Sequence, residues 1–219
     1  NPDTGLDELT LEPISRASAL QRAGRAGRTA PGRCWRLWPE RADARMPVAT
    51  EPEIVRVDLA PTLLLLKAWH GPDPRTFPWF APPEPERVQA GEELLARLGA
   101  VAAPFGPMTP RGKRLARLSA HPRLARLLDD AALAEAAGSH GALAMGATLA
   151  ALLGERDVRL PRPPGRPGAP GRNAVVPDRA DAFDRLEALT RAEAARFRER
   201  LRDEGIDPFA AREVARVRD

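Results

Sequence analysis

Apolar residues recur at helical spacing along most of the chain that follows residue 54. Between Glu84 and Gly99, for example, the apolar side chains fall on one face of a helix that the glycine ends. Thr109 and Asp207 each precede a proline, and a polar cap followed by proline is typical of a helix start. The pattern therefore predicts helices over residues 15–27, 54–70, 84–98, 139–153 and 178–203, and further helices that begin at Thr109, His121 and Asp207.

A different pattern occupies residues 1–40. Residues 1–14 place a turn signal before a short extended run and predict a hairpin. Ser15 is a suitable N-cap for the helix that follows, and Cys34–Trp38 alternates in polarity as a strand does. Strand, helix and strand in this order predict the end of an α/β domain. Because the beginning of that domain is absent and the chain opens at Asn1 rather than Met, we expect a fragment of a longer protein.

Proline and glycine divide the rest of the chain into units. Residues 39–52 predict a connector, residues 100–108 a small β-wing, and residues 158–177 a mobile loop rich in Pro, Gly and Arg. Taken with the helices, these segments predict a fold of the α+β class that is predominantly α.

The composition is rich in arginine but close to neutral overall. The net charge is +4, and all of the 34 basic residues are arginine except Lys67 and Lys113, which brings the sequence pI to about 10.3. A phosphate-facing surface would explain this bias, since arginine binds phosphate oxygens bidentately. A GC-rich coding sequence would explain it as well, so the local clusters must be judged separately.

Several classes of site and location are excluded by the sequence. The single cysteine, Cys34, permits no intrachain disulfide and no cysteine metal cluster. His70, His121 and His140 are too scattered to predict a metal site. The longest apolar run is shorter than the ~20 residues that a membrane helix needs, and no secretory signal pattern opens the chain. We therefore expect a cytoplasmic protein.

Residues 21–28, Gln-Arg-Ala-Gly-Arg-Ala-Gly-Arg, are the strongest candidate for chemistry. Gly24 and Gly27 each cost a helix about 1 kcal/mol relative to alanine, which indicates that the backbone comes close to another group. On a continuous helix, Gln21, Arg25 and Arg28 share one face. An amide that orients water and two guanidinium groups that stabilise negative charge suit the hydrolysis of a nucleoside triphosphate.

This octet resembles motif VI, the arginine-finger motif, of the DEAH-box ATP-dependent RNA helicases. Other stretches are similar to the same family: residues 31–37, 51–56, 59–65, 77–83, 94–99 and 118–125. Within the family the chain most resembles the bacterial HrpB type, to which residues 152–157 are similar. The resemblance implies that residues 1–46 end the second RecA-like domain and that residues 47–118 form a winged helix. Residues 119–219 would form an incomplete helical ratchet (helicase-associated) domain.

The resemblance also implies roles for the residues of the motif. Gln21 would position the hydrolytic water, and Arg25 and Arg28 would contact the γ-phosphate of ATP, which is bound with Mg²⁺ in this family. Arg22 falls off the shared face and would make an interdomain or structural contact. The loop Gly-x-x-x-x-Gly-Lys-Ser/Thr and the Asp-Glu-Ala-His motif are both absent from the chain. We therefore expect these 219 residues alone not to hydrolyse ATP.

Contacts with RNA are predicted less sharply. In relatives of this family, single-stranded nucleic acid threads between the RecA-like pair and the following domains, and such grooves need cations and stacking surfaces. Two basic helix faces are candidates: Arg111, Lys113, Arg114 and Arg117 form one, and Arg123 and Arg126 form the other. Solvated amphipathic helices would carry the same faces. Trp69, Trp79 and Phe80 would either stack on bases or pack a loop against the core.

Different functions are compatible with these features. The leading hypothesis is the C-terminal part of a helicase that couples ATP hydrolysis to movement on RNA, with the other domains of the same chain as its partners. The alternative is a non-enzymatic module that binds nucleic acid or protein through a winged helix and helices. A helical adaptor without a nucleic-acid role is a third reading, which salt-dependent RNA binding would exclude.

Overall fold

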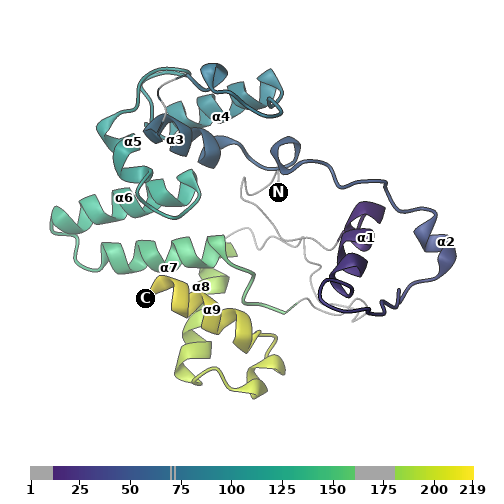
Figure 1. Cartoon of the computed structure of the whole chain (residues 1–219). Coiled ribbons are helices and arrows are strands. Elements are labelled where there is room, and N and C mark those ends of the chain that lie inside the picture. Colours follow the sequence, from purple (N-terminus) through teal and green to yellow (C-terminus); the bar gives the residue numbers. More distant parts are fainter. Residues whose placement is uncertain (1–11, 70, 72, 161–180) are drawn as a thin grey trace, which may run out of the picture.

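The computed structural model describes residues 12–69, 71, 73–160 and 181–219. Helices dominate these residues, as the apolar pattern predicts (Figure 1). The α-helices are α1 (Arg16–Arg25), α2 (Glu40–Asp43), α3 (Ala60–Trp69), α4 (Pro85–Arg97), α5 (Pro110–Leu115), α6 (Pro122–Ala136), α7 (Ala142–Gly154), α8 (Asp181–Ala194) and α9 (Pro208–Arg218). Short 3-10 helices are η1 (Glu53–Val55), η2 (Pro74–Thr76) and η3 (Glu199–Arg202).

Polar caps begin helices where the sequence predicts them. The Ser15 hydroxyl accepts a hydrogen bond from the Ser18 amide in the first turn of α1. Thr109 caps α5 through the Gly112 amide, and Asp207 caps α9. Each cap satisfies an amide that has no partner inside its own helix. These helix starts are therefore confirmed.

Two of the long helices predicted from the sequence are each divided in the structure. The helix expected over residues 54–70 begins at Ala60, because the Asp58 carboxylate accepts a hydrogen bond from the Ala60 amide and starts a new helix there. The helix expected over residues 178–203 ends at Ala194. Arg196 and Phe197 adopt positive φ angles of 51° and 53°, which no continuous helix allows.

The strand predicted at residues 34–38 is not formed. Trp35 and Leu37 are 74% and 93% exposed, and no strand of the described chain lies beside them. A strand needs a hydrogen-bonded neighbour, so the alternating pattern alone does not produce one. Of the hairpin predicted over residues 1–14, residues 1–11 lie outside the described part of the chain.

Extended pairing is limited, among the described residues, to two isolated antiparallel bridges. Val101 pairs with Met108, which confirms a small wing within residues 100–108. Arg159 pairs with Ile206, and Val158 beside it is buried. The mobile loop predicted over residues 158–177 is therefore wrong for residues 158–160, because these residues pack against the turn before α9. Residues 161–177 lie outside the described residues.

The helices enclose two hydrophobic cores. The first is built from α3, α4, α5, the wing and the start of α6, with the buried residues Leu59, Ala60, Leu63, Leu64, Val88, Leu94, Leu95, Ala100, Val101, Leu115 and Ala125. The second is built from α7, α8 and α9, with the buried residues Ala151, Leu152, Val158, Ala188, Leu189, Ala192, Leu201, Ile206, Ala211 and Val214.

Helices α6 and α7 lie side by side and join the two cores (Figure 1). A Cβ on Gly146 would lie 2.4 Å from the Cβ of Ala131, so glycine is what allows this close approach. Helices α1 and α2 lie apart from the other helices, and the connector, residues 39–52, leads from them to α3 (Figure 1). Within the described parts of the chain, none of the helices is long and apolar enough to span a membrane.

Candidate functional site

The octet at residues 21–28 begins inside α1, a helix that is exposed over most of its surface. Ala19 is the residue of α1 that is buried, and the capping residue Ser15 is 2% exposed. Arg22 and Arg25 lie in the last turn, where a positive charge interacts favourably with the negative end of the helix dipole. The buried N-terminus therefore holds α1 and leaves its C-terminal half open.

The structure supports the shared face for Gln21 and Arg25 but not for Arg28. Gln21 and Arg25 lie about one turn apart within α1. The helix ends at Arg25, since the Gly27 amide bonds back to Gly24 in a tight turn, so Arg28 is outside it. The helix predicted to residue 27 is thus too long by two residues. Glycine's low helix propensity is the physical reason that the octet does not stay helical to its end.

The polar groups of the octet have no partner in the part of the chain that the structure describes. The side chains of Gln21, Arg22, Arg25 and Arg28 are all exposed. Although the protein is rich in ion pairs, no carboxylate of the described residues binds these three guanidinium groups. An amide and several unpaired cations at one helix end can bind an anion with several oxygens, such as a phosphate chain.

The close approach predicted for Gly24 and Gly27 is not made by the described residues. A Cβ built on either glycine meets nothing within 4 Å. The close approach lies at Gly32 instead, where a Cβ would be 1.9 Å from the Ala26 carbonyl oxygen. This role of Gly32 was not predicted from the sequence, although a glycine directly after a proline is a turn signal.

The connector holds the N-terminus of α1 through main-chain hydrogen bonds. The Arg16 amide donates to the Pro47 carbonyl at 2.9 Å, and the Ala17 amide donates to the Val48 carbonyl at 3.1 Å. Amides in the first turn of a helix have no acceptor within the helix, so the connector supplies what α1 lacks. Nothing in the local sequence pattern indicates these bonds.

Side chains strengthen the same attachment. The Arg16 guanidinium donates to the carbonyl oxygens of Asp43 and Ala44, at 3.2 and 3.0 Å. The Thr50 hydroxyl donates to the Ser15 hydroxyl oxygen at 3.0 Å. The residue that caps α1 is therefore also the residue that the connector binds.

Half of the six candidate RNA contacts are engaged inside the protein. Arg111 and Arg114 bind the buried carboxylate of Asp129, at 3.1 and 2.5 Å. Arg126 binds Asp130 and donates to the Leu98 carbonyl oxygen. The hydrogen bond from Arg114 holds the pKa of Asp129 below its usual range, with a further contribution from Arg111, although burial opposes the shift. These three arginines join α5 and the end of α4 to α6.

The remaining three candidates are exposed and unpaired. Lys113 and Arg117 belong to α5 and its C-terminal turn, and Arg123 lies in the first turn of α6. None of their side chains contacts a carboxylate of the described residues. The structure thus separates cations that hold helices together from cations that face solvent.

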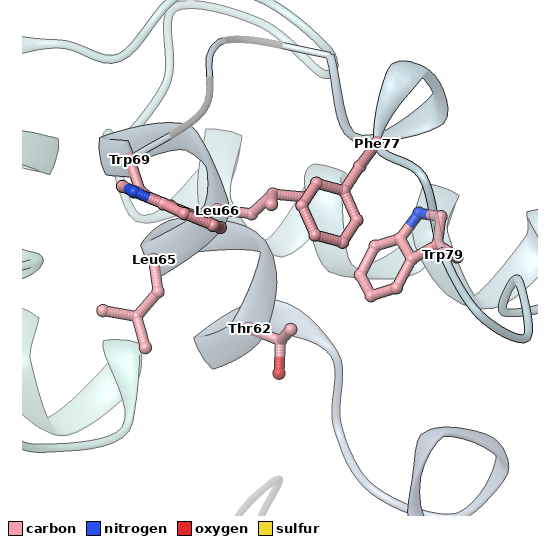
Figure 2. A pocket seen from close by; sticks show the side chains of 6 residues that line it. All are labelled: Thr62, Leu65, Leu66, Trp69, Phe77 and Trp79. Atoms are coloured by element: carbon pink, nitrogen blue, oxygen red, sulfur yellow. The ribbon is translucent and has the colours of Figure 1, made fainter.

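The aromatic residues after α3 line an open apolar hollow of about 370 Å³. Figure 2 shows Trp69 on α3 and Phe77 and Trp79 on the segment that follows η2. The rings of Phe77 and Trp79 meet edge to face, with centroids 4.9 Å apart, and the Trp79 ring nitrogen donates to the Pro74 carbonyl. Trp79 therefore packs the loop, whereas Trp69 and Phe80 are 80% and fully exposed.

The acidic residues and histidines of the described chain do not converge. No group of three or more His, Cys, Asp or Glu side chains lies close enough together there to hold a metal ion.

Comparison with known proteins relates the chain to ATP-dependent RNA helicases. It is 38% identical over 128 residues to the human probable ATP-dependent RNA helicase DHX35, a match that covers 58% of this chain and 18% of that protein. It is 40% identical over 132 residues to HrpA of Escherichia coli, covering 58% of this chain and 10% of HrpA. A probable helicase of Saccharomyces cerevisiae, DHR2, is 40% identical over 124 residues, 57% of this chain and 17% of that protein. No protein-family model matches the chain.

Among solved structures, the chain is similar to the E. coli DExH-box NTPase HrpB. The TM-score is 0.51 and the identity is 35%, over 70% of this chain and 18% of that one. The homologues of the chain are thus DEAH-box ATP-dependent RNA helicases, and the resemblance drawn from the octet is confirmed. The chain spans less than one fifth of the length of these relatives.

Proposed function

We propose that this chain is the C-terminal part of a cytoplasmic DEAH-box ATP-dependent RNA helicase of the HrpB type. Residues 1–46 end the second RecA-like domain, residues 47–118 form the winged helix, and residues 119–219 form an incomplete ratchet domain. The observation that carries this proposal is the exposed C-terminal half of α1. There Gln21 and Arg25 share a face and have no partner among the described residues.

The residues of the octet have separate roles in this proposal. The Gln21 amide orients the water that attacks the γ-phosphate of ATP, as a polar group hydrogen-bonded to that water can. The guanidinium groups of Arg25 and Arg28 stabilise the negative charge that develops on the transferred phosphoryl group. Arg28 lies beyond the helix, so its position depends on the turn at Gly27. Arg22 makes an interdomain or structural contact.

ATP supplies the phosphoanhydride bond, and Mg²⁺ would neutralise charge on its phosphates. The exposed cations of α1 fit the phosphate side of such a nucleotide. The remaining domains of the parent protein supply the phosphate-binding loop and the Mg²⁺ ligands. The chain of 219 residues, taken alone, is therefore inactive as an ATPase.

The exposed cations of α5 and α6 are the proposed contacts with RNA. Lys113, Arg117 and Arg123 face solvent and form no ion pair with a carboxylate of the described residues, so phosphate groups can bind them without breaking such a pair. Arg111, Arg114 and Arg126 hold the helices that present them. Of the aromatic residues, Trp69 and Phe80 are exposed enough to stack on a base.

The test is ATP hydrolysis by the full-length parent protein and its Arg25→Ala variant. Removal of an arginine finger lowers kcat by about 10³-fold or more, so the variant should lose nearly all RNA-stimulated turnover. Arg33→Ala is the matched control, because Arg33 is equally exposed and lies outside the octet. A parent without RNA-stimulated ATPase activity would refute the proposal, as would equal activity of the two variants. Measurable turnover by the 219-residue chain would refute its inactivity.

A further inference from the structure

The hydroxyl oxygen of the buried residue Ser15 links the cap of α1 to the connector. The Ser15 hydroxyl oxygen accepts the Ser18 amide at 3.2 Å and the Thr50 hydroxyl at 3.0 Å. The first of these bonds starts the helix that carries the octet. The second joins that helix to a residue 35 positions further along the chain. A displacement of Thr50 therefore acts directly on the cap of α1.

The connector is the main support of α1 in the described structure. In addition to the bond from Thr50, main-chain carbonyl oxygens of the connector accept hydrogen bonds from the amides of Arg16 and Ala17 and two from the Arg16 guanidinium. In contrast, α1 itself buries only Ala19 against the described residues. Since so little apolar packing holds α1 within these residues, its orientation follows that of the connector.

Three prolines restrict the backbone of the connector. Pro39, Pro47 and Pro52 lie within it, and each proline fixes its own φ angle near −65°. At its C-terminal end η1 follows directly, and α3 of the first core comes next. An ion pair also joins the residues on the far sides of α1 and the connector, because the Arg56 guanidinium lies 3.5 Å from the carboxylate of Glu12, which precedes α1.

We infer that Thr50 is a positioning residue, which through Ser15 couples the orientation of the octet to the helices beyond the connector. The inference rests on the proposed function, in which Gln21 and Arg25 act on ATP and the exposed cations of α5 and α6 bind RNA. Binding of RNA moves those helices, the connector moves with them, and α1 turns. The coupling is reciprocal, so ATP bound at α1 changes the affinity for RNA by the same factor.

Thr50→Val in the full-length parent protein tests this coupling, because valine keeps the shape of threonine and removes the hydroxyl group. Loss of one hydrogen bond of about 0.5–1.5 kcal/mol predicts a decrease of about 2- to 10-fold in the RNA-stimulated kcat. The KM for ATP and the melting temperature should stay near those of the wild type, since Thr50 is exposed and does not touch the nucleotide. Thr50→Ser restores the hydroxyl and should restore kcat.

Thr190→Val is the matched control for the same chemical change. Thr190 is exposed on α8, and its hydroxyl donates to the Leu186 carbonyl of its own helix. The kcat of the parent protein with Thr190→Val should equal that of the wild type. Hydrogen exchange adds a readout independent of turnover: RNA should change the exchange of amides 16–25 in the wild type and change it less in Thr50→Val.

The outcomes separate this inference from the proposed function. If the wild-type parent hydrolyses ATP and Thr50→Val retains the full RNA-stimulated kcat, the coupling is refuted and the proposed function stands. If the melting temperature and kcat of Thr50→Val both fall and Thr50→Ser does not restore them, Thr50 has a structural role and the coupling is also refuted. If the wild-type parent shows no ATP hydrolysis, the proposed function fails and the inference fails with it.

Discussion

Lys67 on α3 and Glu92 on α4 form an ion pair in which neither side chain is exposed to solvent. The Lys67 Nζ lies 3.0 Å from the Glu92 Oε1. The second carboxylate oxygen accepts the Phe105 amide at 2.8 Å, and Nζ lies 3.4 Å from the Gly106 carbonyl oxygen. The pair thus holds the turn of the wing against two helices.

Breaking this pair should strongly destabilise the first core. Glu92→Gln leaves the Lys67 ammonium buried without its counter-charge, and removal of one partner of a buried pair typically costs about 3–5 kcal/mol of the free energy of unfolding. Replacing both members of the pair, with Lys67→Met and Glu92→Leu together, should lower the free energy of unfolding less than Glu92→Gln alone. Urea unfolding of the chain measures the effect. Glu93→Gln, on the exposed side of α4, is the control, and an equal effect of the two single changes would contradict the prediction.

Asp58 and His121 link the starts of two helices. The His121 Nε2 lies 3.1 Å from Asp58, whose other oxygen accepts the Ala60 amide of α3, while the His121 Nδ1 accepts the Arg123 amide of α6. Because Nδ1 acts as an acceptor, the neutral imidazole carries its proton on Nε2 and donates it to Asp58. The hydrogen bond from His121 is the main reason that the pKa of Asp58 lies below its ordinary value of 3.8, against the opposing effect of burial.

This carboxylate should stabilise the fold above its ordinary pKa and lose that contribution in acid. The folded-state pKa is the lower one, so the stabilisation is complete above pH 3.8 and is lost as the pH falls through the lowered value. The difference in melting temperature between the wild type and Asp58→Asn should be largest near neutral pH and shrink in strong acid. Asp203→Asn, at an exposed carboxylate, is the control. A constant difference for Asp58→Asn would contradict this account.

The same substitution should have opposite effects at Gly24 and Gly146. Gly24→Ala meets no neighbour within 4 Å, so the higher helix propensity of alanine should raise the free energy of unfolding by about 0.5–1 kcal/mol. Gly146→Ala brings a Cβ within 2.4 Å of that of Ala131 and should lower it by about 1–3 kcal/mol. Thermal unfolding of the two variants measures both. In the parent protein, Gly24→Ala should lower ATPase activity, and full activity would show that no close approach is needed there.

The exposed cations of α5 and α6 should determine how strongly RNA binding depends on salt. Replacing Lys113, Arg117 and Arg123 with glutamine should reduce the slope of log affinity against log salt by up to about one per residue that binds a phosphate. The measurement is a titration of the parent protein with single-stranded RNA at several salt concentrations. Arg200→Gln, at an exposed arginine on η3, serves as the control. An unchanged slope in the triple variant would remove these residues from the RNA surface.

Local sequence patterns predict where most helices begin and which residues carry the candidate chemistry. Caps such as Thr109 and Asp207 act on amides two or three residues away, so a local pattern contains the whole signal. The candidate chemistry of the octet is also a local prediction, since Gln21 and Arg25 fall on one face of any helix that contains them. The family resemblance rested on these local features, and the comparisons confirm it.

Only the tertiary structure decided which of these residues are engaged and which are available. Arg114 and Lys113 are neighbours in sequence, yet Arg114 binds Asp129 on α6 and Lys113 faces solvent. The strand expected at residues 34–38 lacks a neighbour in the described structure, and the bond from Thr50 to Ser15 joins residues far apart in the chain. Such contacts depend on which segments come to share the same space, and the order of residues within one segment does not contain that information.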